Sequence, residues 1–141
     1  YRADQMRGAV SAGRQAFFLE PGERDAMRWI EAQPGSGAVL APIPDGSYIS
    51  AYTGRAVWIG AGSWTPDFGW RGLAVEAMFN GVSGAAEDQR LVRQSGARFV
   101  YQSCRSKANL APKLGAVVTG PPRQFGCAKV WEVVPPLGGW R

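Results

Sequence analysis

The sequence predicts an α/β domain with a Rossmann-like, three-layer architecture. Short apolar runs alternate with longer segments in which apolar residues recur every three or four positions, a pattern typical of strands joined by helices. Such alternation favours a mainly parallel sheet of about five strands. The last two apolar runs are separated only by the Gly/Pro-rich segment 120–126, which predicts an antiparallel hairpin at one edge.

The chain length predicts a single folded domain. With 141 residues, we expect one core over residues 17–134, a tether or linker over 1–16 and a tail over 135–141. The first residue is Tyr1 and not Met, so we expect an excised piece or a processed form of a longer protein.

The first half of the domain contains one clear helix and two short strands. The segment 17–35 has Pro21 and Glu23 suited to a first helical turn. The apolar run 37–43 predicts a covered strand. The piece 47–52 predicts a short helix, and 55–60 a second strand that ends in a glycine loop.

The second half continues the alternation. Thr65, Pro66 and Asp67 have the residue types of a helix start, and the segment 85–96 predicts a further, more polar helix that ends at Gly96. The remaining expected elements are strands over 97–104, 116–119 and 127–134 and a short helix over 106–116.

Composition and charge exclude several classes of function. The chain has no histidine, which removes the commonest general base, the commonest zinc ligand and every Ser-His or Cys-His nucleophile. We therefore expect no metal site and no cofactor. The net charge of +5 is spread along the chain without a basic block, so no nucleic-acid partner is expected. The charge remains compatible with a weak attraction to anionic headgroups or phosphate-bearing ligands.

The glycine loop does not carry a dinucleotide-binding fingerprint. After Gly60 and Gly62, the position of the third glycine holds Thr65. Pro66 removes an amide donor from the helix start, and Asp67 places a negative charge where an anion would bind. Asp45 and Asp67 could form a carboxylate pair for hydrolysis. A turn role for Asp45 and helix-end compensation for Asp67 are the favoured explanations.

Tryptophans and cysteines give two further hypotheses. Of the six tryptophans, Trp64 and Trp70 flank a loop and a helix start, so they are the candidates for exposed rings that stack on a sugar or a lipid. Cys104 closes one expected strand and Cys127 opens another, which favours a disulfide over a pair of free thiols and leaves the second possibility open.

Two stretches resemble a known family. They are "RDAMRWIEAQPGSGAVLAPIPDGSYISAYTGRAVWIGAGSWTPDF" and "RLVRQSGARFVYQSC". Both look like the extracytoplasmic C-terminal region of bacterial polytopic membrane proteins of, or related to, the C-type glycosyltransferase superfamily. The resemblance spans about residues 17–134. It implies a parent that uses a polyprenyl-phosphate-linked sugar and whose catalytic acids lie near membrane-embedded helices, so no catalytic residue is carried over.

The resemblance implies a set of substrate-binding residues. The family-like positions are Thr53, Gly54 and Arg55, followed by Trp64, Thr65, Pro66 and Asp67. Family members often have a histidine in the loop between these pieces, where this chain reads Gly-Ala-Gly-Ser, which weakens any catalytic role for the loop. We expect Arg55 to contact a phosphate or carboxylate, and Trp64 to stack on a ligand, with Thr53, Gly54, Asp67 and Trp70 contributing.

The leading hypothesis is a non-catalytic accessory domain on the extracytoplasmic face of the plasma membrane. Its expected role is to position an acceptor or a lipid-linked sugar donor over the membrane-embedded remainder of its own chain. Two alternatives stay open at this stage. One is a freestanding nucleotide- or small-molecule-binding α/β enzyme, and the other is a carbohydrate-binding module.

Overall fold

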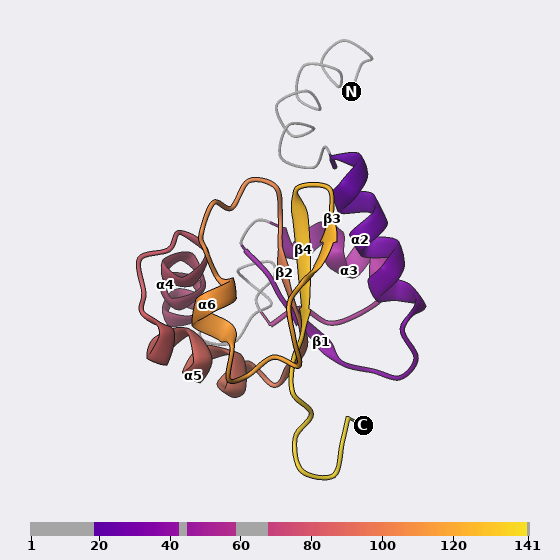
Figure 1. Ribbon diagram of the computed structural model, residues 1–141. Helices are drawn as coiled ribbons and strands as arrows, with labels where there is room; N and C mark the ends of the chain where they lie inside the picture. The colour runs from indigo at the N-terminus through magenta and orange to yellow at the C-terminus, as the bar shows by residue number, and fades with distance from the viewer. Residues whose placement is uncertain (1–18, 43–44, 59–67, 141) are drawn as a thin grey trace.

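The fold is a small mixed sheet with helices on both faces (Figure 1). We analysed a computed structural model, which describes residues 19–42, 45–58 and 68–140. The elements in chain order are α2 (Pro21–Ala32), β1 (Ala38–Leu40), α3 (Gly46–Thr53), α4 (Phe68–Phe79), α5 (Ala85–Ser95), β2 (Ala97–Gln102), α6 (Ala111–Leu114), β3 (Arg123–Phe125) and β4 (Ala128–Glu132).

The described sheet has four strands in the order β1-β2-β4-β3. Strand β1 runs parallel to β2, with Leu40 opposite Val100. Strand β4 runs antiparallel to both of its neighbours, with Trp131 opposite Val100 and Lys129 opposite Gln124. The prediction of a Rossmann-like, mainly parallel sheet of about five strands is therefore wrong.

The two expected strands that are missing from the described sheet are reduced to single bridges. Within 55–60, Val57 forms an isolated parallel bridge to Val39, because β1 is only three residues long and gives little backbone to pair with. Within 116–119, Val118 forms an isolated antiparallel bridge to Val133. Neither segment forms a strand among its described residues.

The edge hairpin exists, but its first strand lies in the segment that was expected to be a turn. Residues Arg123–Phe125 pair with β4, and Gly126 at φ 61° lies in the turn that reverses the chain. A connection this short forces antiparallel pairing. The strand was missed because its residues are exposed or half-buried, so it lacks the apolar pattern on which the prediction depended.

Helices cover both faces of the sheet because the side chains of the central strands alternate. Phe99 and Tyr101 of β2 pack with α2 and α3, whereas Val100 packs with α4, α5 and α6. Figure 1 shows these two helical groups on opposite sides of β2 and β4. Each apolar layer is therefore supplied by alternate residues of the same strands.

The disulfide between Cys104 and Cys127 is confirmed, with Cα atoms 4.9 Å apart. It joins the chain just after β2 to the hairpin turn before β4. The turn is also in close contact with the first turn of α2, because a Cβ built on Gly22 would lie 2.0 Å from the carbonyl oxygen of Phe125. Only glycine lets this helix and this hairpin approach so closely.

We therefore predict that Gly22→Ala lowers the free energy of unfolding by about 1–3 kcal/mol, because the added methyl group meets backbone that cannot move independently. Urea denaturation would measure the change. Gly69→Ala in α4 is the matched control, since a Cβ there meets nothing within 4 Å, and it should be neutral or slightly stabilising. Equal stability of the two variants would contradict the packing described.

Candidate functional site

The segment Thr53–Gly54–Arg55 lines a pocket at the amino end of β1. The opposite wall is the loop of residues 35–38, and the pocket has a volume of about 400 Å³. The structure thus brings together three of the predicted substrate-binding residues. Trp70 is not among the lining residues, and Trp64 and Asp67 lie outside the described residues.

The guanidinium of Arg55 binds backbone carbonyls at the end of α2. Its Nε donates to the carbonyl of Ile30 at 3.2 Å, and its two terminal nitrogens donate to the carbonyls of Gln33 at 2.6 Å and Gly37 at 3.4 Å. The last carbonyls of a helix lack partners within the helix and carry partial negative charge. Helix α2 has no basic residue in its own last turn, so Arg55 supplies the missing cation.

A second arginine binds the carbonyls of the chain that follows α2. The side chain of Arg98 in β2 donates to the carbonyls of Pro34 and Ser36. The guanidinium carbons of Arg55 and Arg98 lie 5.2 and 5.1 Å from the centroid of the same Phe99 ring. Burial lowers the pKa of Arg55, and the nearby charge of Arg98 lowers it further. We refer to Arg55 and Arg98 as the arginine clamp.

Thr53 and Gly54 form the turn that delivers Arg55 to the clamp. The hydroxyl of Thr53 donates to the carbonyl of Ile49 at 2.7 Å and accepts the peptide N–H of Arg55 at 3.1 Å. Gly54 adopts φ 69° and ends α3, as left-handed glycines commonly do. The local chemistry of this segment is therefore that of a helix stop. Ligand contact by these residues stays a prediction.

Trp70 lies elsewhere, on the outer side of α4, with 48% of its surface exposed. Its ring meets the ring of Trp58 edge to face, with centroids 5.6 Å apart. It lines a pocket of about 290 Å³ between α4 and α5, which we call the Trp70 pocket. The expectation that the Trp70 ring is exposed agrees with this position, and its role in binding is still untested.

The polar wall of the Trp70 pocket comes from α5 and the turn before it. Its members are Ser83, Glu87, Asp88, Arg90 and Gln94. Asp88 is only 1% exposed and accepts a hydrogen bond from the Ser83 hydroxyl through one oxygen. Its other oxygen has no hydrogen-bond partner. Burial raises the pKa of Asp88, while the Ser83 bond and the charge of Lys113 oppose that rise.

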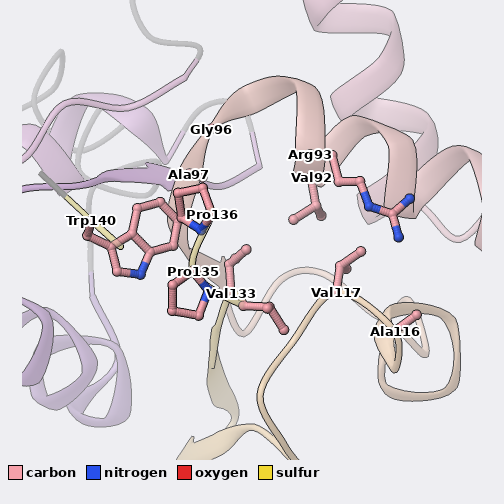
Figure 2. Close-up of a pocket in the computed structure, with 11 residues that line it drawn as sticks. Val92, Arg93, Gly96, Ala97, Ala116, Val117, Val133, Pro135, Pro136 and Trp140 are labelled. Carbon is pink, nitrogen blue, oxygen red and sulfur yellow. The ribbon is translucent and has the colours of Figure 1, made fainter. Parts of the chain in front are cut away.

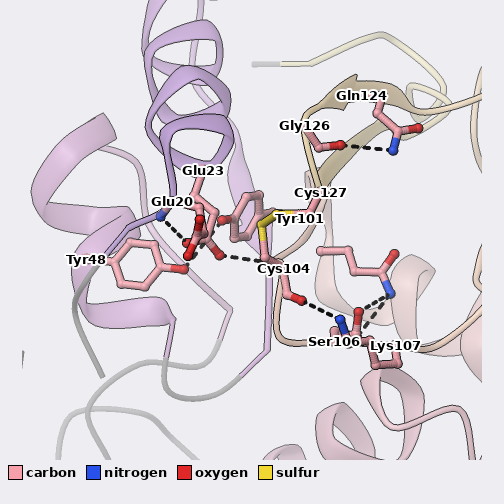
Figure 3. Close-up of a disulfide and its surroundings, with 11 residues drawn as sticks. Glu20, Glu23, Tyr48, Tyr101, Cys104, Ser106, Lys107, Gln124, Gly126 and Cys127 are labelled. Carbon is pink, nitrogen blue, oxygen red and sulfur yellow. Dashed lines mark hydrogen bonds between the residues drawn. A yellow bond between two sulfur atoms is a disulfide. The ribbon is translucent and has the colours of Figure 1, made fainter. Parts of the chain in front are cut away.

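A buried polar cluster next to the disulfide was not foreseen. Figure 3 shows the carboxylate of Glu23 directed toward Cys104, whose peptide N–H donates to it at 3.0 Å. The other Glu23 oxygen accepts the N–H of Glu20 at 2.9 Å. Close by, the hydroxyls of Tyr48 and Tyr101 are 3.4 Å apart. Sequence reasoning assigned Glu23 to helix-end compensation, and nothing in its spacing pointed to a partner 81 positions away.

Asp45 belongs to the same region. It precedes the first residue of α3 and forms an ion pair with Arg105, so its role goes beyond the predicted turn. Burial raises the pKa of Asp45, and its contacts with Tyr48, Arg105 and Ser103 partly offset the effect. No group of three possible metal ligands occurs among the described residues.

A mainly apolar pocket lies at the C-terminal end of β4. Figure 2 shows Trp140, Pro135 and Pro136 around it, facing Val117 and Val133. Its volume is about 440 Å³. The only charged side chain in its lining is that of Arg93, so it offers shape and apolar surface but few directed hydrogen bonds.

Comparison with known proteins adds one finding. No family model and no curated protein matches the chain. Among solved structures, this chain is similar to the C-terminal globular domain of an oligosaccharyltransferase from Archaeoglobus fulgidus. The two share 13% sequence identity at a TM-score of 0.57, and the match covers 82% of this chain and 99% of that chain. The two domains share a fold. None of the helices within the described ranges is both long and apolar enough to cross a membrane.

The clamp leads to a prediction for Arg55. Arg55→Ala should lower the free energy of unfolding by about 2–4 kcal/mol, because three carbonyls lose a charged donor. Arg55→Lys keeps the charge but not the planar fork, so it should fall between the alanine variant and wild type. Arg28→Ala is the control, since the Arg28 side chain is exposed and its ion pair with Asp25 lies at the surface, so the change should cost less than about 1 kcal/mol. If the Arg55→Ala and Arg28→Ala variants have the same free energy of unfolding, the clamp does not stabilise the fold.

Asp45 leads to a prediction of pH dependence. Its pKa in the folded state is raised above the usual 3.8, so the unfolded state holds fewer protons in the window between the two values. Asp45 therefore contributes fully to the free energy of unfolding when the pH is below 3.8. This contribution falls as the pH rises through the folded-state pKa. Urea denaturation of wild type and Asp45→Asn across this window should show the stability of wild type declining relative to the variant. A relative gain of wild type with rising pH would contradict this sign.

Proposed function

We propose that this chain is a non-catalytic accessory domain of a membrane-anchored glycosyltransferase-like protein. The observation that carries the proposal is the shared fold with the C-terminal globular domain of an oligosaccharyltransferase, which extends over nearly the whole of that domain. The sequence resemblance to extracytoplasmic regions of C-type glycosyltransferases supports the same class independently.

The disulfide supports an extracytoplasmic location. Disulfides persist in oxidising compartments and are rare where thiols are kept reduced. Cys127 lies at an exposed turn, where cellular reductants would reach the bond. We place the domain on the outer face of the plasma membrane.

The structural roles of two buried acidic residues, Glu23 and Asp45, support an accessory domain over an enzyme. Glu23 accepts backbone N–H groups, and Asp45 is paired with Arg105. Both carboxylates are buried, and the chain has no histidine to act as a base. The domain would serve by positioning an acceptor or a lipid-linked sugar donor for the membrane-embedded remainder of its parent chain.

A carbohydrate-binding role is the second candidate, favoured by one observation. The exposed ring of Trp70 stands beside polar side chains in a pocket. The two candidates are compatible, because an accessory domain can position a glycan by binding it. A freestanding nucleotide-binding enzyme would instead show saturable thermal stabilisation by nucleotides.

The proposal predicts where the protein is found and the state of its cysteines. The natural full-length protein should fractionate with membranes, because the chain would be attached to a membrane-embedded part. Cys104 and Cys127 should resist a maleimide reagent until a reductant is added. The Cys104→Ser/Cys127→Ser variant controls for labelling at other sites. A protein found in the cytosolic fraction with both thiols reactive would contradict the proposal.

A further inference from the structure

We infer that the Trp70 pocket between α4 and α5 is a contact site for a sugar ring. This inference rests on the proposed function and deepens it, because it gives the glycan a place on the domain away from Thr53–Gly54–Arg55. Three features of the pocket carry it: an exposed ring that packs on a second ring, an apolar floor, and a wall of polar side chains on the neighbouring helix.

The indole of Trp70 is exposed and packs against a neighbouring ring. It meets the ring of Trp58 edge to face, and Trp58 is contacted in turn by Arg71. Arg71 donates to the carbonyl of Trp58 at 3.0 Å, and its guanidinium carbon lies 4.6 Å from the Trp58 ring centroid. An exposed ring of this kind can bind a flat apolar face.

The floor of the pocket is apolar. It is formed by Ala74 and Ala77 of α4 and by Leu91 of α5. The small alanine side chains leave room beside the indole, so a ring of modest size can lie against both Trp70 and the floor.

The wall supplies directed hydrogen bonds. Arg90 and Gln94 are exposed and lie one helical turn apart on α5, so they face the same side of the helix. The carboxylate in reach is that of Glu87, which is also exposed and lines the same wall. Sugar hydroxyls both donate and accept, which suits a wall that combines a guanidinium, an amide and a carboxylate.

Other ligand classes fit this pocket less well. A phosphate would meet the exposed carboxylate of Glu87 beside Arg90, the one cation among the described residues that line the pocket, so the charge balance is unfavourable. A wholly apolar ligand would leave the polar wall without partners, which costs free energy. A neutral saccharide satisfies both the indole and the wall.

The test is a calorimetric titration of the 141-residue chain with maltotriose, mannotriose and chitotriose as probes. We expect saturable binding to at least one of them at millimolar concentration. Trp70→Ala should weaken it about tenfold, and Gln94→Ala about threefold, in line with the loss of one stacking contact and one hydrogen bond. Leu73→Ala is the matched control, because Leu73 is on the same helix and 73% exposed but does not line the pocket.

The outcomes separate this inference from the proposed function. If the Trp70→Ala and Gln94→Ala variants both bind the oligosaccharide as tightly as the Leu73→Ala control does, the inference is wrong. Binding of none of the three probes would also overturn it. Gln94→Ala is the second variant because the Gln94 side chain is exposed and has no hydrogen bond to another described residue, so its loss should not unfold the domain. Membrane fractionation and cysteine labelling test the proposed function separately, whatever the result of the oligosaccharide titration.

Discussion

The arginine clamp at the C-terminal end of α2 is the constraint on which much of the fold depends. A helix that ends against a sheet must find partners for its last carbonyls, and α2 has no basic residue there. Arg55 arrives from the turn after α3, and Arg98 arrives from β2. Because both guanidiniums pack on Phe99, one interaction joins α2, α3 and the central strand.

The opposite end of α2 is fixed just as firmly. Glu23 accepts the N–H of Cys104, the disulfide ties Cys104 to the hairpin turn, and Gly22 lets that turn come into contact with the helix. Helix α2 is thus held at both ends by groups that are distant in the sequence. The contacts at both ends of α2 stabilise that half of the domain. The exposed ring of Trp70 and the polar wall of its pocket lie on the other side, at α4 and α5.

Local signals in the sequence were sufficient for some elements. Pro21 and Glu23 predicted the start of α2, Gly96 the end of α5, and the positions of Cys104 and Cys127 the disulfide. The strand Arg123–Phe125 escaped prediction because an edge strand with polar residues has no apolar alternation. The mainly parallel arrangement was wrong because β4 lies between β2 and β3 and runs antiparallel to both. In addition, two segments expected as strands form only single bridges.

The candidate site shows a similar division. The exposure of Trp70 followed from its place near a helix start, and Thr53–Gly54–Arg55 do share a pocket. The contacts of Arg55 with carbonyls of α2, up to 25 positions away, could not be foreseen, since no pattern in the sequence pairs a loop arginine with the end of a distant helix. The polar wall on α5 was missed because its residues look like an ordinary solvated face until α4 is placed beside them.

The central claim is that this domain meets a glycan through the α4–α5 side while Thr53–Gly54–Arg55 maintain the fold. The most direct measurement is a map of NMR chemical-shift changes during titration with a bound oligosaccharide. We expect chemical-shift changes at the indole N–H of Trp70 and the side-chain amide of Gln94, and none at the backbone amides of Thr53, Gly54 and Arg55. Changes confined to Thr53–Gly54–Arg55, with the Trp70 indole silent, would contradict it.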